Sequence, residues 1–297
     1  MSTPTEGSAA ASTLTPALFK RLHPRPYLTK FLDERVRPDG RPVGQSDDVW
    51  REASVNLGSV STAPSSALVR IGNTTVVCGI TLEIAPPDLA TPYQGFIVPN
   101  IDLSSLCSSK FRPGPPSDES QVVSSRLHDI LENCVDLESL CIEPAKSAFV
   151  VYLDLVCLNY DGGVLDAAVL ASLGALRSLR LPQATYDQDT HETLCEPIST
   201  ENPGHRIRLD AQPCAVSFGY FNGHLLPDPT LFEHELSATR ITIVIDSTTS
   251  TSSSSSSTKL LGVYQAGEPV VAGQRKMLET CLELAQVRAK ELQHLLT

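Results

Sequence analysis

The chain has 297 residues, of which 41% are hydrophobic and 19% are charged, a balance typical of a globular protein with room for about two domains. The net charge of −11 disfavours a free-standing nucleic-acid binder, which would need a basic excess to displace counterions from phosphates. No apolar run reaches the roughly 18 to 20 residues that cross a bilayer, so we expect no membrane segment.

The N-terminal extension, residues 1–34, divides into two parts. Residues 1–15 are rich in Ser, Thr and Ala and have neither a basic start nor an apolar centre, which predicts a disordered tail rather than a signal peptide. Apolar residues then recur at helical spacing and are interrupted by Pro24 and Pro26. Because proline breaks a helix interior, this pattern predicts two short helices.

Residues 35–185 are predicted to form a first α+β domain. Gly72-Asn73 suits a tight turn and joins two of its strands as a hairpin. Residues 150–158 are apolar almost without interruption, so we expect that strand to be covered on both faces. The predicted strands lie at 50–57, 67–71, 74–83 and 148–159, and the predicted helix lies at 121–134.

An Asp161-Gly162-Gly163 turn follows the long strand and leads into an apolar helix that ends before Pro182. Asp161 fits a turn former, because Asp before glycine closes a tight turn with its own side chain. Asp166 fits the N-cap of the helix, because its carboxylate can accept from the free amides of the first turn. The alternative is that carboxylates of this region, with Asp154 in the strand, belong to a catalytic site.

The second half repeats the scheme. Residues 186–206 are polar and contain two prolines, which predicts a crossover loop into a second domain at 207–297. Residues 247–258 are almost pure Ser and Thr and predict a mobile hairpin tip. The predicted elements of this domain are strands at 211–221, 224–226, 240–246 and 259–265 and a long terminal helix.

One loop carries local positive charge in this acidic chain. Lys110, Phe111 and Arg112 place two cations around an aromatic ring, which could combine phosphate pairing with base stacking on RNA. The alternative is a solvated loop that Phe111 anchors to the core. The sequence leaves both readings open.

The eight cysteines are scattered along the chain. They form no Cys-x-x-Cys pair and have no histidines at metal-binding spacing, so we expect them to be reduced and structural. The sequence therefore predicts neither a metal nor a cofactor.

Several segments, in order, resemble the RNase PH family. This resemblance covers roughly residues 35–297 and implies an RNase PH-like (ribosomal protein S5 domain 2-like) α+β fold with two βαβα-type domains. It also implies an ancestral site for phosphorolytic 3′ exoribonuclease chemistry. The segments that carry it are Arg37-Pro-Asp-Gly-Arg41, Leu57-Gly-Ser-Val-Ser-Thr-Ala63, residues 66–79, residues 98–107 and the Asp-Gly-Gly turn.

Residues 107–116, Cys-Ser-Ser-Lys-Phe-Arg-Pro-Gly-Pro-Pro, resemble the ring subunits of the eukaryotic RNA exosome, in a branch regarded as noncatalytic. The resemblance implies other RNase PH-like subunits in a six-member ring, cap proteins and a separate hydrolytic nuclease. RNA would pass through the central channel during ribosomal RNA processing and RNA degradation. It further implies a location in the nucleus and nucleolus and also in the cytoplasm.

Departures from the active family pattern predict a lack of catalysis. Val164-Leu165 stands where active relatives have Thr-Arg, and only Arg126 remains in a helix that is otherwise arginine-rich in them. Loss of two charge-assisted contacts, each worth roughly 1.5 to 3 kcal/mol, would slow phosphorolysis about a hundredfold or more. The competing hypotheses are an active phosphate-dependent exoribonuclease that uses Asp154, Asp161 and Arg126, and a free-standing RNA-binding adaptor.

Overall fold

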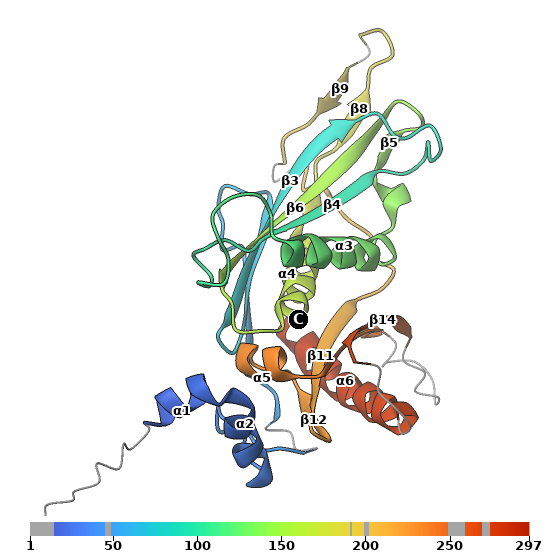
Figure 1. Ribbon diagram of the computed structural model, residues 1–297. Coiled ribbons are helices and arrows are strands. Elements are labelled where there is room, and N and C mark those ends of the chain that lie inside the picture. The colour runs from blue at the N-terminus through green and yellow to red at the C-terminus, as the bar shows by residue number, and fades with distance from the viewer. Residues whose placement is uncertain are drawn as a thin grey trace, which may run out of the picture.

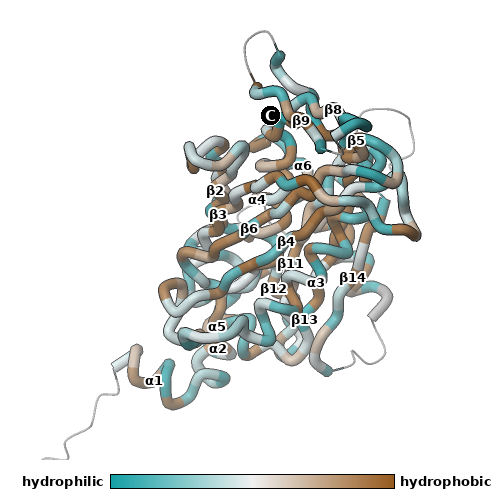
Figure 2. Tube along the Cα trace, turned by 90° about the horizontal axis from the view of Figure 1, so that it is seen from above, coloured by the Kyte–Doolittle hydropathy of each residue, from teal (hydrophilic) through white to brown (hydrophobic). Residues whose placement is uncertain are grey.

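The computed structural model describes residues 15–44, 49–190, 192–198, 202–248, 259–268 and 274–296. Two β-sheets enclose a central helix, and two short N-terminal helices lie beside the second sheet, at the lower left of Figure 1. Hydrophobic segments run through the middle of the molecule, along α4, β6 and β11 (Figure 2). The predicted tail and most of the predicted Ser/Thr hairpin tip lie outside the described residues.

The prediction of two short N-terminal helices is confirmed. They are α1 (Pro16–Leu22) and α2 (Pro24–Asp33), and a proline opens each of them. Proline is tolerated at the first helical position because the amide that it lacks has no partner within the helix there. Leu28 and Leu32 of α2 pack against Phe221 and Leu226 in a small hydrophobic cluster of their own, which attaches the extension to the second sheet.

The first sheet is mostly antiparallel, with strand order β1-β2-β3-β6-β4 and with β5 on β6. The Gly72-Asn73 hairpin pairs Ile71 with Thr74, as predicted. The helix α3 (Asp118–Glu132) connects the parallel strands β4 and β6 and packs on β4. The strands are β1 (Ala53–Leu57), β2 (Ser65–Ile71), β3 (Thr74–Ala85), β4 (Phe96–Asp102), β5 (Cys141–Glu143) and β6 (Ser147–Asn159).

The expectation that β6 is covered on both faces is wrong. Beyond Val151 its residues alternate, with Leu153 and Leu155 buried and Asp154 and Val156 exposed. Side chains of alternating residues point to opposite faces of a strand. Both α3 and α4 pack on the same face of this sheet, so only every second residue of this part of β6 is buried. The continuous apolar pattern therefore reflects one buried face and one open face that carries valine and leucine.

The central helix α4 (Val164–Ser178) lies between the two sheets and contacts β2 and β3 of the first and β11 of the second. Every residue from Val164 to Leu176 is buried. The helix is therefore covered around its whole circumference rather than along one stripe. At Gly174 an added Cβ would lie 3.1 Å from a methyl group of Leu57, which shows how closely the layers pack.

The second sheet is antiparallel, with strand order β12-β11-β13-β14. The predicted long terminal helix is α6 (Gln274–Leu296), which packs against β11 and β13. A short helix, α5 (Leu231–Leu236), was not predicted. The strands are β11 (Pro213–Phe221), β12 (His224–Pro227), β13 (Thr239–Asp246) and β14 (Leu260–Gly267).

The predicted crossover segment and the residues just before it contain short strands. The strands β8 (Ala184–Tyr186) and β9 (Thr193–Cys195) form a hairpin that projects at the top of Figure 1. The strands β7 (Arg180–Leu181) and β10 (His205–Arg206) pair with each other. No described helix is long and apolar enough to cross a membrane.

Candidate functional site

A cavity of about 330 Å³ opens between the two halves of the chain. The helix α3 forms one wall, the turn before α4 forms another, and β11, α5, β13 and β14 close the remaining sides. Its titratable side chains include Lys110, Glu119, Arg126, His234 and Arg240. The residues that follow the Asp-Gly-Gly turn line this cavity, which is where the sequence resemblance implies the ancestral site.

The first cation of the cavity is already paired. The ammonium of Lys110 lies 2.7 Å from a carboxylate oxygen of Glu119, and the hydroxyl of Tyr160 donates to the other oxygen. Burial alone would raise the pKa of the Glu119 carboxyl, but the bonds from Lys110 and Tyr160 outweigh burial and lower it. The charge of Lys110 is thus met by a carboxylate that is ionised at neutral pH.

The other cationic residues of the cavity are occupied or neutral. The guanidinium of Arg126 lies over the ring of Tyr264, 4.9 Å from the ring centre. Arg240 donates to Nε2 of His234 over 3.2 Å. Burial, and then the positive charge of Arg240, lower the pKa of His234 to about 4, so this imidazole is neutral at physiological pH and adds no positive charge.

Apolar side chains occupy the turn that faces the cavity. Val164 and Leu165 begin α4, line the cavity and are 6% and 5% exposed. Neither side chain can donate a hydrogen bond to an anion. Asp118 and the half-exposed Val122 complete this side of the wall, so the cavity presents mixed charge over an apolar surface.

The three residues of the enzyme hypothesis do not come together. Asp154 is exposed on the face of β6 that points away from the helices, because its neighbours Leu153 and Leu155 are buried against them. Asp161 accepts from the amide of Leu231 and from the side chain of Asn73, each over 3.2 Å. Of the three, only Arg126 lines the cavity.

The aromatic residue of the proposed RNA contact at 110–112, Phe111, is buried. Phe111 is 7% exposed and packs edge-on against Tyr160, so its ring is not available to stack on a base. The alternative that Phe111 anchors the loop is confirmed. Lys110 is paired with Glu119 as described above, and Arg112 is exposed without a salt bridge to any described residue.

The glycine pair is required by the turn, as predicted. Gly162 and Gly163 have φ angles of 78° and 65°, which side chains disfavour. A Cβ on Gly162 would lie 2.8 Å from the carbonyl oxygen of Pro229. Asp161 does not close the turn with its own side chain. It instead connects the turn to the β2–β3 hairpin and to the start of α5.

The expectation that Asp166 caps α4 is wrong. The N-cap is Gly163, with no side-chain cap, and Asp166 lies inside the first turn. Its carboxylate accepts from the amide and the hydroxyl of Ser217, each over 2.9 Å. These bonds fix α4 to β11 of the second sheet, so the residue holds the two halves together, and it does not line the cavity.

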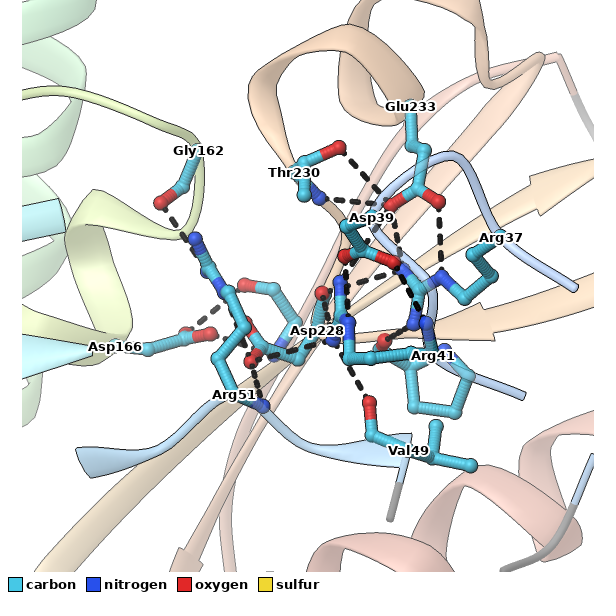
Figure 3. Close-up of polar contacts among 12 residues, drawn as sticks. Arg37, Asp39, Arg41, Val49, Arg51, Gly162, Asp166, Asp228, Thr230 and Glu233 are labelled. Carbon is cyan, nitrogen blue, oxygen red and sulfur yellow. Dashed lines mark hydrogen bonds and ion pairs between the residues drawn. The ribbon is translucent and has the colours of Figure 1, made fainter. Parts of the chain in front are cut away.

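Behind the cavity lies a buried pair of Arg51 and Asp228 (Figure 3). Arg51 donates from Nε and Nη2 to the two carboxylate oxygens of Asp228, over 3.0 and 2.5 Å. The same guanidinium donates to the carbonyls of Asp161 and Gly162. Burial raises the pKa of Asp228, but Arg51 outweighs burial and lowers it. This pair connects the Asp-Gly-Gly turn to the loop before α5.

A second buried pair holds the Arg-Pro-Asp-Gly-Arg segment. Arg37 is 1% exposed and donates to both carboxylate oxygens of Glu233 and to the carbonyl of Pro227. Arg41 donates to the carbonyls of Val49 and Asp228. Both arginines therefore fix the N-terminal segment to α5 and the loop before it (Figure 3).

The buried Asp166 carboxyl predicts a pH dependence of stability. Burial, and then the nearby Asp228, raise the pKa of Asp166 to about 7, against about 3.9 in an unfolded chain. Between these values the folded state binds more protons than the unfolded state, so stability from this group is fully present below about pH 4 and declines until about pH 7. We expect a decline on the order of a few kcal/mol.

Comparison with Asp166→Asn isolates this effect. His234 has a lowered pKa and therefore the opposite slope in this pH range, and it is present in both proteins. In denaturant unfolding from pH 4.5 to 7.5, the free energy of unfolding of the variant should rise more, or fall less, with increasing pH than that of the native chain. Parallel profiles would contradict the assignment.

Comparison with known proteins agrees with this architecture. The RNase PH model for domain 1 of the 3′ exoribonuclease family matches residues 50–182, and the model for domain 2 matches residues 211–288. The chain belongs to the RNase PH family. Exosome complex component rrp43 of Schizosaccharomyces pombe is 40% identical over 276 residues, which cover 92% of this chain and 95% of that protein.

More distant RNase PH relatives come from archaea. Exosome complex component Rrp42 of Pyrococcus furiosus is 34% identical over 227 residues, covering 75% of this chain and 78% of that protein. Among solved structures, a chain of the Archaeoglobus fulgidus exosome with RNA bound to the active site has a TM-score of 0.73 and 25% identity, covering 91% of this chain and 96% of that one. The two-domain RNase PH-like α+β fold is thereby confirmed.

The buried ion pairs of this RNase PH chain were not predicted. The Arg-Pro-Asp-Gly-Arg motif marked Arg37 and Arg41, but nothing near them in sequence indicates their partners. One signal was available for Glu233, because Thr230 and Glu233 form a capping box at α5 with the Thr-x-x-Glu spacing of that motif.

Proposed function

We propose that this chain is a noncatalytic ring subunit of an RNA exosome, which supports 3′-to-5′ RNA processing and decay by threading RNA to a separate nuclease. The similarity to exosome complex component rrp43 over 92% of the chain supports the placement in a ring. Other RNase PH-like subunits, cap proteins and the nuclease would be its partners, with RNA in the central channel.

The main support for inactivity of this subunit is that its cavity has few free positive groups to hold anions. Phosphorolysis must hold two anions, inorganic phosphate and an RNA phosphodiester, while negative charge develops on the leaving oxygen. Here Lys110 is neutralised by Glu119, His234 is uncharged, and Val164 and Leu165 occupy the turn. Two missing charge-assisted contacts reduce the rate about a hundredfold or more.

One observation favours the active alternative. Arg126 and Arg240 both line the cavity, and two arginines could hold one phosphate. The decisive assay measures phosphate-dependent release of nucleoside diphosphates by the assembled ring, without the hydrolytic nuclease. Comparison of the native ring with an Arg126→Ala/Arg240→Ala ring assigns any activity to this chain.

We expect the double substitution to leave the release rate unchanged. The matched control is Arg70→Ala, which removes an exposed arginine on β2, away from the cavity. A tenfold or greater loss in the double variant, with none in the control, would establish catalysis by this subunit and defeat the proposal.

The RNA contact in this proposal depends on the exposed Arg112 rather than on the whole 110–112 loop. Weak RNA binding by the isolated chain distinguishes a ring subunit from a free-standing adaptor, whose affinity would be strong and would fall steeply with salt.

We also propose that the protein works in the nucleus and nucleolus and in the cytoplasm. A fluorescent fusion expressed at native level tests this location.

A further inference from the structure

The strand β14 forms one edge of the second sheet, and β13 is its partner within the described part of the chain. Its sequence, Leu-Leu-Gly-Val-Tyr-Gln-Ala-Gly, contains neither a charged residue nor a proline. Natural edge strands are usually short, charged, interrupted by proline or covered, since an exposed ladder of peptide groups pairs with other chains. The opposite edge follows this rule, because β12 has four residues and ends in Pro227.

The register shows which peptide groups of β14 point outward. The amide of Glu268 donates to the carbonyl of Ala238, and Tyr264 and Ala266 continue the same series of hydrogen-bonded pairs with β13. In an antiparallel ladder these pairs alternate with residues whose peptide groups point to the other side. Val263 and Gln265 are such residues, so their N–H and C=O groups face the free edge.

The side chains of β14 suit a protein strand. Leu260 and Val263 are 48% and 45% exposed, and Tyr264 is held on the cavity side by Arg126. A nucleic acid would require cations, and β14 has none. An extended peptide satisfies the alternating donors and acceptors and can cover the apolar side chains.

We propose that β14 is the docking edge for an extended strand of a neighbouring RNase PH-like subunit, so that the second sheet continues across the subunit boundary. The proposal rests on the ring function proposed above. A second copy of this chain is a poorer occupant, because each copy carries a net charge of −11 and two copies repel each other.

Residue-resolved amide hydrogen exchange tests the docking edge in the free chain and in the assembled ring. In the free chain we expect slow exchange at Tyr264 and Ala266 and fast exchange at Val263 and Gln265. In the ring all four should be slow, with the outward pair slowed at least tenfold. Fast exchange of Val263 and Gln265 in a ring that contains this chain would overturn the proposal.

A proline substitution gives a second test. Gln265→Pro removes one outward N–H and leaves the inward ladder intact, which an edge strand tolerates. Gln265→Ala removes only the exposed side chain and is the matched control. We expect both variants to fold, with the proline variant entering rings at least tenfold less well. Equal incorporation would overturn the proposal, and if the proline variant does not fold, hydrogen exchange decides alone.

The outcomes separate the two proposals. A native chain that enters no ring defeats the proposed function. A native chain that enters the ring while its outward amides stay unprotected defeats only the docking edge. Protection of these amides in a homodimer of the free chain would assign the edge to a second copy and overturn the neighbour proposal.

Discussion

Replacement of Arg51 with methionine is expected to lower the free energy of unfolding by about 3 to 5 kcal/mol, because it removes the bidentate partner of the buried Asp228 carboxylate and leaves Arg41, 3.8 Å away, as its nearest described cation. Asp228 is 5% exposed, and each of its carboxylate oxygens accepts a hydrogen bond from the guanidinium of Arg51. The substitution also removes donors to the carbonyls of Asp161 and Gly162. The turn that opens α4 would lose its connection to the second domain.

Equilibrium denaturant unfolding of the purified chain measures this loss. Arg70→Met is the matched control, because Arg70 is exposed on β2 and its guanidinium makes a local bond to Gly72. We expect less than about 1 kcal/mol for the control. The double variant Arg51→Met/Asp228→Asn should recover part of the loss, because it removes the buried charge that has lost its bidentate partner. Equal effects for Arg51→Met and the control would refute the account.

Arg37→Met should have a similar effect, about 3 to 5 kcal/mol, because it removes the bidentate partner of the fully buried Glu233 carboxylate and leaves it with Thr230 and with Arg41 at 3.7 Å. Its consequence is local as well as global. Arg37 fixes the segment after α2 to α5 and to Pro227, and the attachments that remain include the bonds of Arg41 and the small cluster around Leu28 and Leu32. The N-terminal segment should therefore detach before the rest unfolds.

Limited proteolysis distinguishes this local release from general destabilisation. We expect Arg37→Met to be cut between residues 34 and 44 at least tenfold faster than the native chain, under conditions where the body stays folded. Arg35→Met is the control, since Arg35 is an exposed residue two positions away. Equal cleavage of both variants would show that the buried pair does not hold the segment.

The elements with strong local patterns were predictable from the sequence. The hairpin at Gly72-Asn73, the two proline-initiated helices and the long terminal helix all depend on neighbours within a few residues. The errors occurred where distant residues decide. Asp166 was assigned as a cap from its position before an apolar run, but its partner Ser217 lies 51 residues away.

The candidate site shows the same division. The replacement at Val164-Leu165 was visible in the sequence, and both residues line the cavity. The sequence could not show that Glu119 neutralises Lys110 or that Tyr160 covers Phe111, because the fold brings the loop at 110–111 to the start of α3 and to the residue after β6. It also could not show that Asp154 points away from the cavity, since this depends on which face of the sheet the helices cover.

The bond between Arg37 and Glu233 joins residues that are 196 positions apart, which has a consequence for synthesis on the ribosome. At roughly 5 to 20 residues per second, about 10 to 40 s pass between translation of the arginine and translation of its carboxylate. The N-terminal segment emerges first and yet can reach its final place only near the end of translation. In a nascent chain arrested before residue 233, this segment should therefore be accessible to chaperones that bind near the ribosomal exit tunnel.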